Sequence, residues 1–127
     1  MRTNVTGEHI TLTPDIYAYL NKKMAHVEKM LGDAGRYAVA HVEIGKTTEH
    51  HKSGNLFEAK VTMSVDGKDF TEVAEGETLY GAIDRMKDDI CRELTSYKDK
   101  KITLVRRGGR SVKNILRRLW PFGSREE

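Results

Sequence analysis

Few side chains in this sequence have the type and spacing that catalysis or metal binding requires. Glu49, His50 and His51 are consecutive, and adjacent histidines can bind a transition metal, but no third ligand is near them in the sequence. Cys91 is the single cysteine, and no general base lies near it. We therefore expect no catalytic residue and no metal site. A metal-dependent enzyme built on the two histidines is a distant alternative.

The glycine-rich motifs that bind nucleotide phosphates are missing. Neither GxxxxGK[ST] nor GxGxxG between a strand and a helix occurs in the sequence. We therefore expect no cofactor and no nucleotide hydrolysis, which favours a binding protein over an enzyme.

Basic side chains are the more informative group. On a helix that includes residues 14–31, Lys22, His26 and Lys29 lie within about 60° of one another, with Tyr19 beside them and Lys23 to the side. Such a stripe can neutralise phosphates, and an aromatic ring can stack on an exposed base. An ordinary solvated helix face is the alternative.

The cations of a second expected helix fall into three groups that differ in their surroundings. Arg85 and Arg92 share a sector with aspartates, so ion pairs compete with any nucleic acid. Lys87 flanks the apolar stripe. The remaining lysines gather near the expected carboxyl end, where compensation of the helix dipole explains part of their presence; they are Lys98, Lys100 and Lys101.

The end of the chain is strongly basic. Residues 106–127 have seven basic and two acidic side chains, a net charge of +5, whereas the other residues carry −2. This imbalance predicts a polyanionic partner, either nucleic acid or an anionic membrane surface. Residues 111–120 have the spacing of a short amphipathic helix, which is too short to be stable alone in water. The tail cations expected to bind are Arg106, Arg107, Arg110, Lys113, Arg117 and Arg118.

The chain is long enough for one domain, which must position these basic side chains. Its 127 residues are 38% hydrophobic and contain no apolar run as long as the roughly 20 residues of a membrane span. The first residues lack the apolar core of a signal peptide, and one cysteine cannot form an internal disulfide. We therefore expect a cytoplasmic protein.

Hydrophobic periodicity predicts the elements. A strand at 2–7 precedes a helix that Thr13 caps, that Pro14 begins and that Gly32 ends. Its apolar stripe is Tyr17, Leu20, Met24, Val27 and Leu31. Alternation predicts strands at 37–44 and 57–65, and Asp66-Gly67 is a hairpin signal before a strand at about 68–74 whose register is open. The second helix is expected at 78–100, with the stripe Leu79, Ile83, Met86, Ile90, Leu94 and Tyr97.

The expected fold class is α+β, with the order β-α-β-β-β-α and two helices on one face of a four-stranded sheet. Gly108-Gly109 separates this body from the tail. We place a binding domain at 1–105 and a basic tail at 106–127.

The sequence resembles the ribosome hibernation promoting factors, also called ribosome-associated inhibitors or ribosomal subunit interface proteins. The similarity covers about residues 1–101. It lies in Asn4-Val5-Thr6-Gly7, in Leu20-Asn21-Lys22-Lys23 and Val27-Glu28-Lys29, in Arg92-Glu93-Leu94 and Tyr97-Lys98-Asp99-Lys100, and above all in residues 74–84, AEGETLYGAID. The resemblance implies a fold similar to a double-stranded-RNA-binding domain.

The resemblance also implies a function. Members of the family occupy the small subunit over the decoding region in stationary phase or stress, which blocks messenger and transfer RNA and keeps the intact ribosome idle. The resemblance implies the small subunit, its RNA and the intact ribosome as partners, and no membrane. Family members use basic side chains of both helices against ribosomal RNA, and the matching positions are Lys22, Lys23, Lys29, Arg92, Lys98 and Lys100.

Two departures qualify the resemblance. Asp89 and Glu93 make the second helix less basic than in many relatives. The second, dimerising domain of long members does not fit in this length, so we expect a short-type protein that is monomeric off the ribosome. The complete set of expected RNA contacts is Lys22, Lys23, His26, Lys29, Arg85, Lys87, Arg92, Lys98, Lys100, Lys101, Arg106, Arg107, Arg110, Lys113, Arg117 and Arg118.

Alternatives remain open at this point. A free double-stranded-RNA-binding protein or RNA chaperone can use the same fold. For the tail, we expect 106–118 to continue along the messenger path, with Leu119 or Trp120 as an anchor. The rival for residues 112–120 is a basic amphipathic helix that lies on a membrane or in the groove of a partner.

Overall fold

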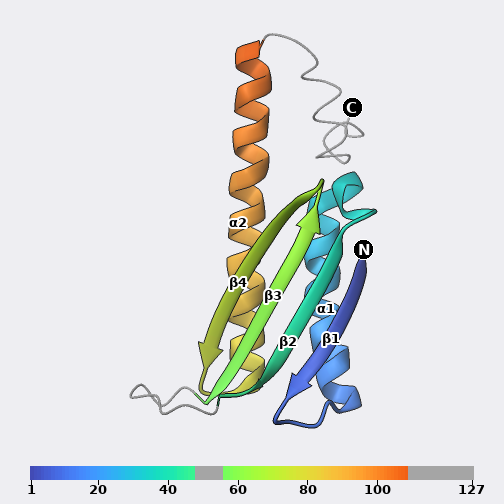
Figure 1. Ribbon diagram of the computed structural model, residues 1–127, viewed down its shortest axis with the longest axis vertical. Coiled ribbons are helices and arrows are strands. Elements are labelled where there is room, and N and C mark those ends of the chain that lie inside the picture. The colour runs from blue at the N-terminus through green and yellow to red at the C-terminus, as the bar shows by residue number, and fades with distance from the viewer. Residues whose placement is uncertain (48–55, 109–127) are drawn as a thin grey trace.

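The computed structural model describes residues 1–47 and 56–108, with side chains up to Lys101. Four strands form one sheet, and two helices cover one of its faces (Figure 1). The order is β1 (Arg2–Glu8), α1 (Pro14–Leu31), the short 3-10 helix η1 (Gly32–Gly35), β2 (Val39–Lys46), β3 (Phe57–Val65), β4 (Lys68–Gly76) and α2 (Leu79–Gly108). The predicted α+β class and element order are confirmed.

The strands lie in sequence order across the sheet. β1 and β2 are parallel, because α1 crosses between them on one face, whereas β2, β3 and β4 are joined as antiparallel neighbours. The predicted turn between β3 and β4 is confirmed, with φ of 54° at Asp66 and 78° at Gly67. Two consecutive positive φ angles are what a tight hairpin turn requires.

The predicted start and end of α1 are also confirmed. The Thr13 hydroxyl accepts a hydrogen bond from the Ile16 amide at 3.3 Å, Pro14 is the first helical residue, and Gly32 follows the last with φ of 64°. Four members of the expected apolar stripe are buried. The prediction that Tyr17 belongs to this buried stripe is wrong, because 40% of Tyr17 is exposed.

Helix α2 begins and ends later than expected. It starts at Leu79 and continues to Gly108 instead of ending at Lys100. The expected end rested on a cluster of lysines, but lysine is a good helix former and does not stop a helix. No glycine or proline interrupts the chain between Gly81 and Gly108. Residues 106–108, which we assigned to the tail, are therefore helical.

The strand boundaries required smaller corrections. β1 and β4 run to Glu8 and Gly76, and β2 is shifted to Val39–Lys46, which leaves Tyr37 outside the sheet. The open register of β4 is resolved, because Phe70 is buried against the helices and Val73 is exposed on the opposite face. The start of α2 lies close to Gly76, since a Cβ there would be 2.8 Å from the Ala82 amide nitrogen.

The core lies between the sheet and the two helices. Figure 1 shows α1 behind β1 and β2, and α2 behind β3 and β4. The largest fully buried side chains come from both helices and from the two central strands; they are Leu20, Met24, Val27, Leu31, Val42, Ile44, Met63, Ile83, Met86, Ile90 and Leu94. The inner faces of both helices are therefore packed against the sheet, and their outer faces remain open to a partner.

Candidate nucleic-acid interface

The two helices run side by side in the same direction (Figure 1). Contacts along the seam between them show the alignment: the Tyr19 hydroxyl donates to the Asp84 carboxylate at 2.6 Å, and the Lys98 ammonium donates to the Met30 carbonyl at 2.9 Å. Cations on the outer side of either helix can therefore contact the same partner.

The stripe predicted on α1 reaches solvent. Lys22, His26 and Lys29 are all exposed. None of them has a carboxylate within 4.0 Å among the residues that the structure describes. An exposed ammonium without an acidic partner is available to a phosphate, so Lys22 and Lys29 are the strongest interface candidates on this helix.

Lys23 lies in the seam and is paired. Its ammonium is 3.2 Å from the Asp84 carboxylate and 5.1 Å from the centre of the Tyr19 ring. Hydrogen bonding to Asp84 raises the pKa of both Tyr19 and Lys23. Burial by itself would raise the pKa of Asp84, but the hydrogen bonds from Tyr19 and Lys23 outweigh burial and keep this pKa below its usual value. This cluster joins α1 to α2.

Lys98 was expected to present its charge to RNA, but the residue is only 2% exposed. Its ammonium donates to the carbonyl of Met30, which is in the last turn of α1, where helix carbonyls lack partners within the helix. Burial lowers the pKa of Lys98. The side chain therefore fastens the end of α1 to α2 and does not present its charge to a partner.

The predicted competition from aspartates on α2 is confirmed for Arg92 but not for Arg85. Arg92 is 3.0 Å from Asp89, and the Lys87 ammonium is 3.3 Å from Asp88. Arg85 instead donates to the backbone carbonyl of Glu75 at 3.2 Å. Lys100 is exposed without an acidic partner in the described part of the chain, and Lys101 is half-buried.

One cation that the sequence analysis missed lies beside Lys101. The ammonium groups of Lys68 and Lys101 are 5.4 and 5.5 Å from the centre of the Tyr97 ring, which also contacts the ring of Phe70. Lys68 is at the start of β4 and shares the face of Phe70. Once the register of β4 is known, this alternation places Lys68 against α2.

Tyr19, the expected aromatic neighbour of the basic stripe, is joined there by a second ring. Tyr19 is half-buried, and its ring meets that of Tyr80 edge to face, with centroids 4.6 Å apart and planes at 81°. Tyr80 is the more exposed ring. Together with Asp15, Ala18 and Lys22, these two rings line a hollow of about 530 Å³ at the amino ends of both helices.

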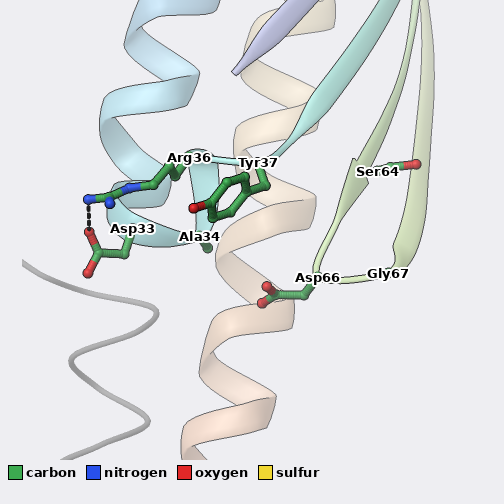
Figure 2. A pocket seen from close by; sticks show the side chains of 7 residues that line it. All are labelled: Asp33, Ala34, Arg36, Tyr37, Ser64, Asp66 and Gly67. Carbon is green, nitrogen blue, oxygen red and sulfur yellow. Dashed lines mark hydrogen bonds and ion pairs between the residues drawn. The ribbon is translucent and has the colours of Figure 1, made fainter.

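A second hollow of about 460 Å³ lies where η1 meets the turn between β3 and β4 (Figure 2). Figure 2 shows Tyr37 beside the ion pair of Arg36 with Asp33, which are 3.5 Å apart, and Asp66 across from them. Its lining combines carboxylates and a cation, so its chemistry does not select a ligand class.

Comparison with known proteins identifies the family. The family model described as sigma 54 modulation protein / S30EA ribosomal protein matches residues 3–102. The chain belongs to this family. The predicted family resemblance is therefore confirmed, and the matched region contains every element of the fold except the first residue of β1 and the last residues of α2.

Curated relatives within the family are ribosome hibernation promoting factors. The protein of that name from Escherichia coli K12 is 33% identical over 101 residues, which are 79% of this chain and 96% of that protein. The protein of the same name from Pseudomonas putida is 26% identical over 105 residues, which are 83% of this chain and 94% of that protein.

Solved structures of family-like proteins share the fold. The N-terminal domain of Protein Y from Thermus thermophilus aligns with a TM-score of 0.63 at 20% identity, over 76% of this chain and 99% of that domain. A ribosomal subunit interface protein from Coxiella burnetii aligns with a TM-score of 0.62 at 15% identity, over 78% and 99%.

The six positions that the family resemblance implied as RNA contacts have different surroundings. Lys22, Lys29 and Lys100 are exposed without an acidic partner among the described residues. Lys23 and Arg92 are paired with aspartates, and Lys98 is buried. The side chains of Arg106 and Arg107 and all of Arg110, Lys113, Arg117 and Arg118 lie outside what the structure describes, as do His50 and His51.

The open face of the sheet has the opposite charge. The strand registers place five carboxylates and two cations on it, namely Glu8, Glu43, Glu58, Asp69 and Glu75 with Arg2 and Lys60. Beside α2, burial and the neighbouring Glu93 and Asp89 raise the pKa of Glu72. The carboxylates disfavour a polyanion on the open face of the sheet, whereas the helix side exposes Lys22, Lys29 and Lys100 together with carboxylates such as Asp88 and Glu93.

Other kinds of site find no support in the part of the chain that the structure describes. No group of three or more histidine, cysteine or acidic side chains there could hold a metal ion. Cys91 is half-buried, and burial raises the pKa of its thiol. Among the described helices, none combines the length and the apolar character of a membrane span.

Proposed function

We propose that this chain is a ribosome hibernation factor. It binds the small subunit in the channel between the subunits, occludes the sites of messenger and transfer RNA, and inhibits translation in stationary phase or stress. The family supports the ribosome as partner. The observation that carries the proposal is the unequal charge of the two faces. Lys22, Lys29 and Lys100 on the helices are exposed without an acidic partner among the described residues, whereas carboxylates predominate on the open face of the sheet.

The interface that we propose runs along the outer face of the helices. Lys22 and Lys29 of α1 contact ribosomal RNA phosphates, and Lys100, Lys101 and Lys68 extend the surface along α2. Each ammonium that meets a phosphate releases condensed counterions, so binding weakens as salt rises. Inhibition is then steric, since a rigid domain occupies a channel that the translating ribosome needs, and no reaction is catalysed.

The tail extends this interface in the proposal. Arg106 to Arg118 continue along the messenger path, which would add phosphate contacts to those of the helices. Truncation after Gly108 keeps all of α2 and is expected to lower affinity and reduce the salt dependence of binding. An unchanged salt dependence would remove the tail from the interface.

Co-sedimentation tests the function directly. Purified protein is layered with vacant ribosomes or separated subunits on sucrose gradients at low and moderate salt, with messenger and initiator transfer RNA as competitors. We expect comigration with the small subunit and the intact ribosome, and loss of comigration on competition. Binding to free duplex RNA with equal affinity, and no preference for ribosomes, would favour the RNA chaperone alternative and refute the proposal.

Variants separate the interface from nonspecific charge. Lys22→Gln and Lys29→Gln are each expected to weaken small-subunit binding and to lower the slope of log affinity against log salt by about 0.9. Lys60→Gln is the matched control, because Lys60 is a lysine on the acidic open face of the sheet. A slope that falls equally in all three variants would show that net charge alone drives binding. Sedimentation of the unbound protein should show a monomer.

A further inference from the structure

The hollow at the amino ends of α1 and α2 combines flat rings with charge. Its lining is Asp15, Ala18, Tyr19, Lys22 and Tyr80, and it is a shallow hollow that is wide open to solvent. It adjoins the exposed lysines of α1, because Lys22 belongs both to its lining and to the basic stripe. An RNA strand on that stripe therefore passes the opening of the hollow.

The two rings form a fixed corner. Their planes meet at 81°, so a flat group stacked on one ring is nearly perpendicular to the other. The Tyr19 hydroxyl donates to the Asp84 carboxylate at 2.6 Å, and the Lys23 ammonium lies over the Tyr19 ring. These two contacts hold Tyr19 in place. Tyr80 packs on Tyr19 and is still 41% exposed. A ring that is supported on one side and open on the other loses little entropy when a ligand stacks on it.

The charged groups suit the two parts of a nucleotide. Lys22 has no acidic partner within 4.0 Å in the described part of the chain, so its ammonium is available to a phosphate. Asp15 is exposed on the lining and can only accept hydrogen bonds when ionised. Guanine is the base whose Watson–Crick edge carries two adjacent N–H donors, which match the two oxygens of one carboxylate.

We propose that this hollow is a subsite for one unstacked RNA base, with guanine preferred. The base stacks on Tyr80, Asp15 accepts hydrogen bonds from its edge, and Lys22 contacts the adjoining phosphate. This inference deepens the proposed function and rests on it, because it names a base contact within an interface otherwise made of phosphate contacts. Phosphate contacts set position, whereas a base contact adds sequence or site preference.

Affinity for the small subunit is the first test. Tyr80→Leu is expected to weaken binding about 5- to 150-fold, as the loss of one base stack does, while Tyr80→Phe retains the ring and the affinity. Tyr17→Leu is the matched control, because Tyr17 has almost the same exposure, 40% against 41%, and lies outside the hollow. Thermal unfolding of each variant shows that the fold is kept. Equal affinities for Tyr80→Leu and Tyr17→Leu would overturn the proposal.

A test without ribosomes keeps the two proposals distinguishable. Nucleoside monophosphates are titrated into the full chain while the ring protons of the tyrosines are observed by NMR. Guanosine monophosphate should shift the Tyr80 signals at lower concentration than the other three, and Asp15→Asn should abolish this preference. Shifts at Tyr80 without ribosome binding would refute the hibernation function alone, whereas ribosome binding that Tyr80→Leu leaves intact would refute the base subsite alone.

Discussion

Asp84→Asn should make the protein bind RNA more tightly while it folds less stably. The Asp84 carboxylate accepts hydrogen bonds from the Tyr19 hydroxyl at 2.6 Å and is 3.2 Å from the Lys23 ammonium, so it neutralises a lysine that lies between the exposed lysines of α1 and the second helix. Asparagine keeps the shape of the side chain and can still accept from Tyr19. It removes one negative charge from the proposed interface and releases Lys23.

The two magnitudes follow from these contacts. Because the pair is partly exposed, the substitution replaces a charge-assisted bond by a neutral one and should cost about 1 kcal/mol of unfolding free energy. One additional phosphate contact by Lys23 steepens the slope of log affinity against log salt by about 0.9. The variant should therefore lose about 3.5-fold more affinity than the wild type when salt rises from 50 to 200 mM.

The pH dependence of stability provides a second readout. The folded-state pKa of Asp84 is lowered, so this carboxylate stabilises the fold above its unfolded pKa, and the stabilisation disappears as pH falls through its folded pKa. The asparagine of the variant cannot titrate. The stability difference between wild type and variant should therefore shrink in acid, as measured by urea unfolding at several pH values.

Small-subunit affinity at four salt concentrations is the assay. Asp69→Asn is the control, because it removes one carboxylate from the open face of the sheet, far from the seam. If Asp84→Asn and Asp69→Asn have equal salt slopes, Lys23 does not reach the RNA and the assignment of the interface to the helix face at this point is wrong.

Three further outcomes follow from described contacts. Lys98→Met should lose about 1 to 3 kcal/mol in urea unfolding, because the Met30 carbonyl is left without its donor, and its salt slope on the small subunit should stay at the wild-type value. Lys68→Gln should lower that slope by about 0.9, which would establish the lysine that the sequence analysis missed as part of the interface. Cys91 should react with iodoacetamide at pH 8 more slowly than in urea-unfolded protein, because its raised pKa and partial burial reduce the accessible thiolate; equal rates would contradict this.

Periodicity predicted the elements because the core of this fold is amphipathic in a simple way. The apolar residues of α2 recur at helical spacing, and those of β3 alternate, so each element indicates its own buried face. The end of α2 was harder to predict. Lysine clusters are common at helix ends but do not terminate a helix, and only the glycine at position 108 provided a stop signal.

The surroundings of the cations could not be predicted in the same way. Lys98 and Lys23 are buried or paired because of Met30 and Asp84, which lie on the other helix and more than 60 residues away in sequence. A helical wheel places a side chain around its own axis but does not include the neighbouring helix. For the same reason Tyr19 was expected to offer a stacking surface, whereas packing against Tyr80 leaves Tyr80 as the more exposed ring.

The opposite charges of the two faces have a consequence for stoichiometry. A small protein with cations on all sides crosslinks polyanions and precipitates with them as its concentration rises. Here the carboxylates on the open face of the sheet point away from any RNA that the helices hold, and they repel a second strand. We therefore expect the described domain to cover an RNA surface as a single layer and not to crosslink two RNA strands.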